Sequence, residues 1–323
     1  MPITSKQATR LIKRLPVNRS VSTVARSSSR ISRIASAIVK SPPVPAGVAL
    51  FEKENNVGAN YDTDWARSYP ARIARVLILN GLMKPVVDLL ATPTVHGTDR
   101  LNDLDGPVIF AANHHSHVDT PLMMTAIPEP WRNRLFIGAA ADYWFTNRIT
   151  SPLSALAIGA IPVERTKVSR KAIDQSLELL KENWSMLIFP EGARSPDGWA
   201  RPFTSGAAFL SSHSGVPVVP VYLHGTNKVL PKGKNFPRPA RTSVIFGSPM
   251  QSADGEDSRA FSARIQSAVA ALGDESATNW WQAQKNAAAA STPTLDGPDT
   301  GAWRRSWART SKVKGPRRNW PKV

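Results

Sequence analysis

The stretch Val108-Ile-Phe-Ala-Ala-Asn-His-His-Ser-His-Val-Asp119 joins an apolar run to the densest group of polar side chains in the chain. Its apolar part, residues 108–112, follows the turn-forming sequence at 105–107 and is typical of a buried strand. The polar part begins where that strand ends. In open α/β sheets ligands and chemistry gather at the ends of strands. This stretch therefore predicts both a fold class and the place of a site.

Further strands and helices alternate along the chain. Apolar runs predict strands at 186–189, 216–223 and 242–246. A single apolar face predicts helices over 171–184 and around 261–272. Alternating strands and helices indicate an α/β fold, a single domain with a mainly parallel central sheet flanked by helices. We expect this domain to occupy residues 66–273.

An amphipathic helical segment should precede the sheet. The stretch Val76–Leu90 is apolar but is interrupted by five residues, Asn80, Gly81, Lys84, Pro85 and Asp88. A spanning helix needs about 20 uninterrupted apolar residues. We therefore expect one or two amphipathic pieces, either buried or lying in a membrane surface.

The net charge of +17 belongs to the two ends of the 323-residue chain. Residues 1–51 carry nine Lys or Arg and residues 301–323 carry eight, with no acid in either range, so the residues between them are balanced. The folded centre therefore gives no reason to expect nucleic acid, although a polycationic chain first suggests it. We predict a basic flexible arm with a linker at 1–65, and a linker with a basic tail containing Trp at 274–323. Such tails suit an anionic membrane surface, with solvated tails as the alternative.

Composition also bears on location and chemistry. The chain has no cysteine, which excludes disulfides, thiolate metal sites and a cysteine nucleophile. The first 40 residues lack the apolar run of a secretory signal. We expect a peripheral protein on the cytoplasmic face of a membrane, with an organellar transit peptide as an alternative for the N-terminal arm.

His114 and Asp119 form the first candidate site. A carboxylate can accept from one imidazole nitrogen, fix the tautomer and leave the other nitrogen to take a hydroxyl proton. This requires the turn after His114 to fold back, because neither a strand nor a helix brings positions five apart together. Solvated loop residues are the alternative. A zinc site would use His115, His117 and Asp119, but the next residue is Thr120 where that pattern needs a histidine. We predict no metal.

Two more clusters could bind an anion. Phe189-Pro-Glu-Gly-Ala-Arg-Ser195 follows a predicted strand and offers the Arg194 guanidinium, a flexible Gly192 and the Glu191 carboxylate. A turn with an internal Glu–Arg pair is the alternative. Gly159-Ala-Ile-Pro-Val-Glu-Arg165 ends in a second cation, or in a solvated charge at the end of a strand.

Taken in order, these clusters and a fourth resemble the glycerolipid acyltransferase family, which includes the 1-acylglycerol-3-phosphate acyltransferases. The family's Asn-His-x4-Asp block is matched by Asn113, His114 and Asp119. The remaining blocks are matched by Gly159, Ile161 and Arg165; by Phe189, Pro190, Glu191, Gly192, Arg194 and Ser195; and by Val216, Pro217, Pro220 and Val221. The resemblance extends from about residue 70 to residue 250.

The resemblance implies an O-acyltransferase. His114 would deprotonate the acceptor hydroxyl, which attacks the carbonyl of a thioester, and Asp119 would orient His114. Arg165, Glu191, Gly192 and Arg194 would bind the phosphate of the acceptor. The donor would be acyl-CoA or acyl-carrier protein, with no bound cofactor. The best match for the acceptor is 1-acylglycerol-3-phosphate, which gives phosphatidate.

Two departures and two alternatives accompany this interpretation. Ala193 stands where the family commonly has Thr, and Thr204 and Ser205 precede Gly206 where a Lys is common. Another lipid or glycolipid acceptor is therefore one alternative. The other is an inactive protein with the same core that binds an anionic surface or nucleic acid.

Overall fold

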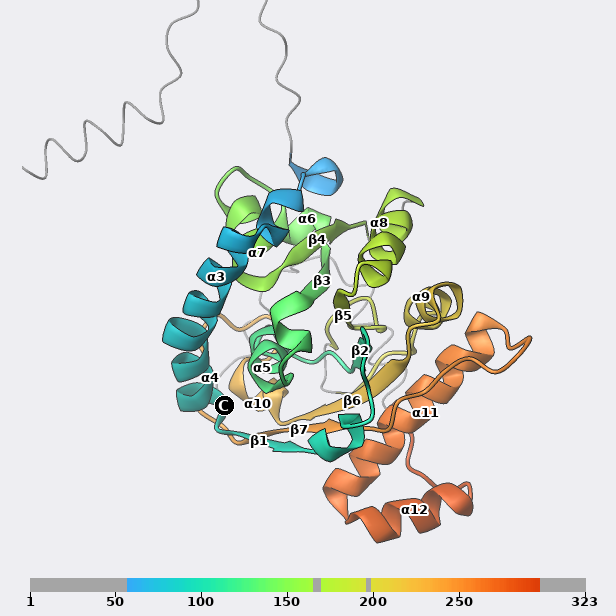
Figure 1. Ribbon diagram of the computed structural model, residues 1–323. Coiled ribbons are helices and arrows are strands. Elements are labelled where there is room, and N and C mark those ends of the chain that lie inside the picture. The colour runs from blue at the N-terminus through green and yellow to red at the C-terminus, as the bar shows by residue number, and fades with distance from the viewer. Residues whose placement is uncertain (1–56, 165–169, 196–198, 297–323) are drawn as a thin grey trace, which may run out of the picture. The chain divides into compact units, whose positions relative to one another are not determined.

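The central sheet has seven strands in the order β1-β7-β6-β2-β5-β3-β4. The computed structural model describes residues 57–164, 170–195 and 199–296 (Figure 1). The strands are β1 (Pro93–His96), β2 (Ile109–Ala112), β3 (Leu135–Ala140), β4 (Ala160–Val163), β5 (Ser185–Ile188), β6 (Val218–His224) and β7 (Thr242–Phe246). All neighbours pair in parallel except β6 and β7, which are antiparallel. The predicted mainly parallel sheet is confirmed.

Strand β2 lies inside the sheet and carries the polar cluster at its end. Ile109 pairs with Met186 of β5 on one side and with Val218 of β6 on the other. All four residues of β2 are buried. A parallel strand covered on both faces needs an uninterrupted apolar run rather than alternation, which explains why residues 108–112 are so distinct in the sequence.

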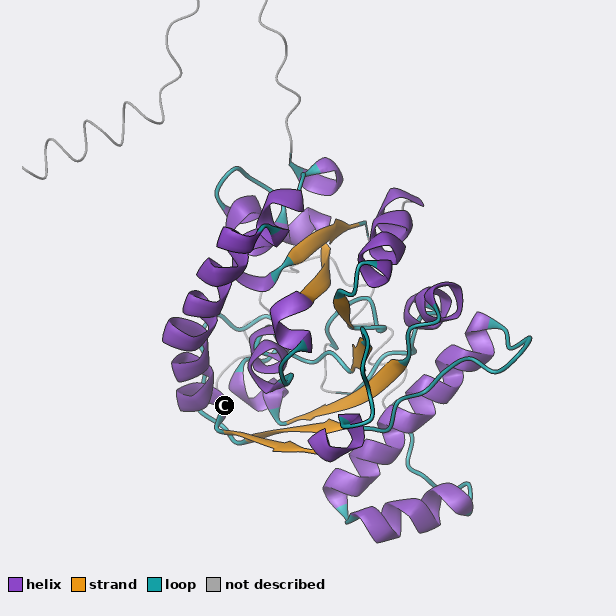
Figure 2. Cartoon of the chain, in the orientation of Figure 1, coloured by secondary structure: helices purple, strands orange, loops and turns teal. Residues whose placement is uncertain are grey.

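Helices cover both faces of the sheet (Figures 1 and 2). The longer ones are α3 (Tyr69–Ile78), α4 (Lys84–Ala91), α5 (Asp119–Ala126), α7 (Thr150–Ile158), α8 (Arg170–Lys181), α9 (Gly206–Ser214), α11 (Ser258–Ala277) and α12 (Trp280–Ala288). The short ones are η2 (Gly58–Asn60), η3 (Asp64–Arg67), η4 (Leu79–Met83), η5 (Thr98–Leu101), η6 (Trp131–Arg134), α6 (Ala141–Trp144) and α10 (Thr226–Val229). Phe110 packs in the core with α4, α5 and α7, whereas Ile109 packs in a second core with α8, α9 and α11.

The expected amphipathic segment is one bent rod, α3–η4–α4, in which η4 is a π-helical turn. Arg75 fastens it to the domain. Its buried guanidinium donates to the carbonyl oxygens of Leu156 at 2.8 Å, Ala155 at 3.1 Å and Ala66 at 2.8 Å. Leu156 and Ala155 belong to the last turn of α7, whose carbonyls lack partners within the helix. Burial, together with the charges of Arg67 and Arg72, lowers the pKa of Arg75 to about 10.

Replacing Arg75 by methionine should lower the free energy of unfolding by about 2–4 kcal/mol, because three buried carbonyl groups would lose their donor. Urea denaturation followed by circular dichroism measures this. Lys84→Met is the control, since the Lys84 ammonium is half exposed and pairs with Asp88 on its own helix. Equal stability of the two variants would contradict the role of Arg75.

The domain is longer at both ends than the predicted range of 66–273. The first helical turn in the described part of the chain, η2 (Gly58–Asn60), precedes residue 66. At the other end, residues 280–288 form α12 rather than the predicted linker. Asn279 caps this helix by accepting from the Gln282 N–H at 2.9 Å, and the Asn286 amide donates to Asp274 of α11 at 2.7 Å. These contacts stabilise α12, which has only a short apolar face of its own.

Residues 1–56 and 297–323, which include most of the predicted N-terminal arm and the basic C-terminal tail, lie outside the described residues. Within 57–164, 170–195 and 199–296, no helix is long and apolar enough to cross a membrane.

Candidate active site

The site begins at the carboxyl end of β2, where Asn113 fixes the turn to the neighbouring strand. The Asn113 side chain is fully buried and pairs with the backbone of Leu223 in β6. Its Oδ1 accepts the Leu223 N–H at 2.7 Å, and its Nδ2 donates to the Leu223 carbonyl at 3.0 Å. This amide therefore continues the β2–β6 ladder one step beyond the strand and sets where His114 leaves the sheet.

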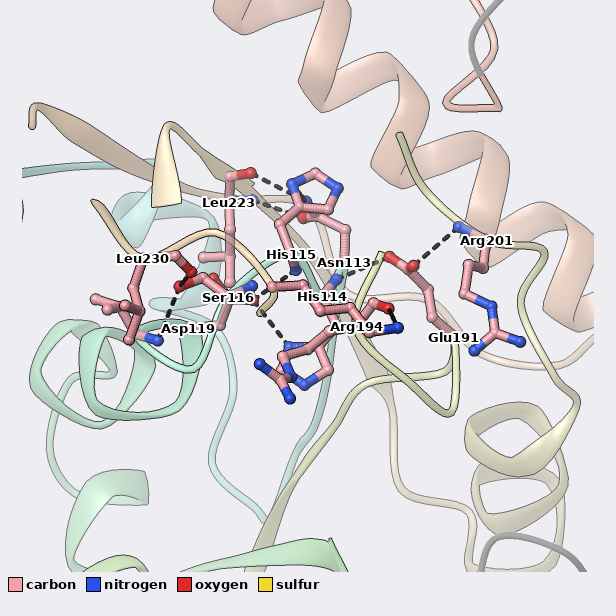
Figure 3. A network of polar contacts seen from close by, with 12 residues as sticks. Asn113, His114, His115, Ser116, Asp119, Glu191, Arg194, Arg201, Leu223 and Leu230 are labelled. Carbon is pink, nitrogen blue, oxygen red and sulfur yellow. Dashed lines mark hydrogen bonds and ion pairs between the residues drawn. The ribbon is translucent and has the colours of Figure 1, made fainter. Parts of the chain in front are cut away.

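His114 and Asp119 are in direct contact (Figure 3). The Nδ1 atom of His114 lies 2.8 Å from Oδ2 of Asp119. The same oxygen accepts the backbone N–H groups of His115 and Ser116, both at 2.7 Å. Asp119 is the first residue of α5, and the hydrogen bonds to its carboxylate hold the intervening turn in a folded-back conformation. The fold-back that the dyad requires is thus made by Asp119.

Asp119 is fully buried but remains ionised at neutral pH. Burial alone would raise the pKa of its carboxyl, but the hydrogen bond and charge of His114 outweigh this effect and hold the pKa below its usual value. The Thr226 hydroxyl and the Ser116 N–H act in the same direction. An ionised Asp119 that accepts at Nδ1 places the proton of a neutral His114 on that nitrogen.

The other side of the His114 ring faces the second cluster. The ring stacks on Phe189, with centroids 4.1 Å apart and an interplanar angle of 18°. The His114 side chain keeps 18% of its surface exposed. Among the described residues, none hydrogen bonds to Nε2 of His114. This nitrogen is therefore placed to accept a proton from a bound substrate.

The loop 189–195 wraps around His114. Glu191 is buried, and its carboxylate accepts the N–H of His114 at 2.7 Å and that of Arg201 at 2.8 Å. The Ser195 N–H donates to the His114 carbonyl at 2.8 Å. Gly192 turns the loop with a φ of +66°, in the left-handed region that favours glycine.

Arg194 is a cation within the loop 189–195. Burial, followed by the positive charge of Arg194, lowers the pKa of His117 to about 4. The Arg194 charge therefore acts within the turn that holds the dyad, and Figure 3 draws its guanidinium beside His114. The Lys232 ammonium donates to the Arg194 carbonyl at 3.1 Å and adds a second positive charge. Arg165, the other predicted phosphate ligand, lies outside the described residues.

The three residues of the alternative zinc site point to different partners. Nδ1 of His115 lies 3.4 Å from the Asn113 amide, and Nε2 of His117 lies 3.0 Å from the Tyr143 hydroxyl. Asp119 is engaged by His114. In the part of the chain that the structure describes, no group of three His, Asp or Glu side chains could hold a metal ion.

Sequence reasoning gave no role to Asn113, Phe189 or Ser195, all of which contact His114 or fix its strand. Each belongs to a block that carries the family resemblance, but its partner lies tens of residues away. No spacing rule within one block indicates such a contact. The only sequence signal for these contacts was that the four blocks occur together in one chain.

The architecture and the dyad define a class: an α/β protein with a His–Asp pair at the carboxyl end of a central parallel strand. Comparison with known proteins agrees. The model of the Acyltransferase family matches residues 92–224. A chloroplastic 1-acyl-sn-glycerol-3-phosphate acyltransferase of Brassica napus is 32% identical over 145 residues, which cover 43% of this chain and 39% of that protein. The corresponding enzyme of Pseudomonas aeruginosa is 35% identical over 112 residues, or 34% of this chain and 43% of that protein.

The crystal structure of the 1-acyl-sn-glycerophosphate acyltransferase from Thermotoga maritima has the same fold. Its TM-score is 0.54 at 23% identity, over 68% of this chain and 84% of that one. Over residues 92–224, which hold both the dyad and the loop 189–195, the chain is similar to the Acyltransferase family. Its matched part spans less than half the length of these two curated relatives.

Proposed function

We propose that this protein is an O-acyltransferase that moves a fatty acyl group from a thioester to a hydroxyl of a lysophospholipid. The acceptor we propose is 1-acylglycerol-3-phosphate, and the donor is acyl-CoA or acyl-carrier protein. The observation that carries the proposal is the contact between His114 Nδ1 and Asp119 Oδ2, which leaves Nε2 free for a substrate proton. The names of the matched relatives support the choice of acceptor.

In the proposed reaction, His114 Nε2 removes the proton of the acceptor hydroxyl as its oxygen attacks the thioester carbonyl carbon. The ionised Asp119 stabilises the imidazolium that forms. The carbon–sulfur bond then breaks, and the leaving thiolate takes the proton back from His114. The products are an ester and a free thiol, so the reaction consumes no cofactor.

Arg194 is the group we propose for the phosphate of the acceptor, together with Arg165. A guanidinium presents a planar pair of donors that fits phosphate oxygens. Gly192, which is exposed, leaves the loop open on that side because its position carries no side chain. Glu191 is buried, and its carboxyl oxygens accept the backbone N–H groups of His114 and Arg201 instead.

The test is acyl transfer from radiolabelled oleoyl-CoA or oleoyl-acyl-carrier protein to a panel of acceptors. The panel comprises 1-acylglycerol-3-phosphate, neutral and zwitterionic lysolipids, and a glycolipid. Label in phosphatidate supports the proposed acceptor. Transfer only to another acceptor would retain the mechanism and replace the substrate, whereas no transfer with either donor would favour the inactive binding protein.

We also propose that the protein lies on a membrane surface through the rod α3–η4–α4. Six apolar side chains on this rod are at least 44% exposed: Tyr69, Ile73, Leu77, Leu82, Val86 and Leu89. Their spacing is three or four residues except across η4, where it is five. A π-helical turn accommodates the extra residue. Leu82 therefore stays closer to the side of the rod that carries Leu77 than it would in a regular α-helix. An apolar helical face of this kind inserts into the boundary of a lipid layer.

Leu77→Gln combined with Leu82→Gln should lower partitioning onto lipid vesicles by at least about tenfold, since burying each leucine is worth about 1.5–3 kcal/mol. Co-sedimentation with neutral and with anionic vesicles measures this. Phe236→Gln is the control, because that ring is 85% exposed on another part of the domain. Deletion of residues 1–47 and 301–323 should instead reduce binding to anionic vesicles only. Unchanged partitioning of the leucine variant would contradict the proposed surface.

A further inference from the structure

Glu191 joins two segments of backbone from a buried position (Figure 3). Glu191 is only 3% exposed to solvent. One carboxylate oxygen, Oε1, accepts the N–H of His114 at 2.7 Å, and the other, Oε2, accepts the N–H of Arg201 at 2.8 Å. A phosphate would have to displace one of these two N–H donors to contact the carboxyl group. Glu191 is therefore poorly suited to bind the acceptor.

The same loop holds His114 at two further points. The Ser195 N–H donates to the His114 carbonyl, and the Phe189 ring stacks on the imidazole. The peptide groups on both sides of His114 and its ring are thus all in contact with residues 189–195. At Nδ1 the imidazole contacts the carboxylate of Asp119. The angle at which the ring approaches Asp119 is set by where this loop holds the backbone.

Burying this carboxylate carries a cost that its two bonds offset only in part. Burial raises the pKa of Glu191 to about 8, and the negative charge of Asp119 adds to the increase, while the two N–H donors and Arg201 oppose it. A glutamine of the same shape would be far easier to bury. The carboxylate differs from glutamine in one respect that matters here: both of its oxygens can accept an N–H, whereas an amide has only one acceptor.

We infer that Glu191 is a positioning residue for His114, which fixes the backbone beneath the base rather than the phosphate of the acceptor. The inference deepens the proposed function and rests on it. The two charged residues of the loop then have different roles, because Glu191 holds the backbone of His114 and Arg194 is the proposed ligand of the acceptor phosphate. A displacement of reacting groups by about 1 Å can cost about 10²-fold in rate.

The kinetic test compares Glu191→Gln with Glu191→Asp and with Glu178→Gln, an exposed glutamate on α8. We expect Glu191→Gln to lower kcat by about 10²-fold with less than about a threefold change in the KM of the acceptor. Glu191→Asp keeps two acceptor oxygens on a shorter stem and should recover part of the loss. Glu178→Gln should match the unaltered protein. A rise in the KM of the acceptor with unchanged kcat would instead assign Glu191 to the phosphate and overturn the inference.

A second measurement does not depend on turnover. In protein labelled with ¹⁵N-histidine, the ring nitrogens of His114 report its tautomer and its bond to Asp119. Glu191→Gln should shift both signals and alter their titration, and Glu178→Gln should leave them in place. If Glu191→Gln does not fold, Glu191→Asp is measured in the same way. His114 signals identical to those of the unaltered protein in a folded Glu191 variant would overturn the inference even if no acyl transfer is found.

Discussion

Replacing His114 by alanine should reduce acyl transfer by at least about 10²- to 10⁴-fold, the range that general base catalysis supplies. The imidazole is the only described group that combines an ionised partner at one nitrogen with an open second nitrogen. The loss should appear in kcat, because the ring takes its proton as the hydroxyl attacks. Initial rates with oleoyl-CoA and 1-acylglycerol-3-phosphate measure it.

His96→Ala is the matched control for this variant. His96 lies on the edge strand β1 and is exposed, so its removal should leave the rate unchanged. A thermal melt of His114→Ala shows whether the turn survives without the ring, since Asp119 would still accept from His115 and Ser116. Transfer at the normal rate by a folded His114→Ala would exclude the general-base role.

The same variant separates the enzyme from the inactive binding protein. A protein that only binds anionic surfaces would lose nothing when this partly exposed side chain is removed. The charge balance of the centre points the same way, because the whole positive excess lies in the two ends of the chain. Activity that depends on His114 and vesicle binding that depends on Leu77 and Leu82 would place the two functions on separate parts of the domain.

Some of the buried strands of the sheet could be predicted from the sequence, but β3 was missed although four of its six residues are buried. Strands β2, β5 and β7 consist of uninterrupted apolar residues or nearly so, and their predicted ranges agree with the structure within about a residue. Strand β1 was missed, because it is short and three of its four residues are exposed. Helix α12 was missed for a related reason: Ala283 is its only buried residue, and a hydrogen bond from Asn286 to Asp274 of α11 helps to stabilise it.

The dyad could be predicted, because its two residues lie in one short segment and a single turn joins them. The contacts that surround it could not. Asn113 reaches Leu223, and Glu191 reaches His114, across 110 and 77 positions. Such pairs depend on the strand order, which places β2 between β5 and β6. For the same reason, the sequence suggested that Glu191 binds substrate, whereas its burial becomes evident only once the loop is packed against β2.

Asp119→Asn should lower kcat by about 10²- to 10⁴-fold while it keeps the fold of the turn. The Oδ2 atom accepts from the His114 ring and from two backbone N–H groups, and an asparagine carbonyl oxygen can take its place. The negative charge is lost, so the imidazolium formed during the reaction is no longer stabilised, and the proton of the neutral ring is no longer held on Nδ1 by a charge. The KM of the acceptor should change little, because Asp119 is fully buried and does not touch it.

The pH dependence of stability gives an independent check on this charge. The folded pKa of Asp119 lies below its usual value, so the stabilisation it supplies is complete above that usual value, about 4, and is lost as the pH falls through the folded pKa. The part of the difference in free energy of unfolding between Asp119→Asn and the unaltered protein that comes from the titration of Asp119 should therefore be constant between pH 6 and pH 8, and it should shrink only in acid. Urea unfolding across this range measures it. A difference that disappears near pH 6 would mean that Asp119 carries a proton in the folded protein, and the negative charge that stabilises the imidazolium in the proposed reaction would then be absent.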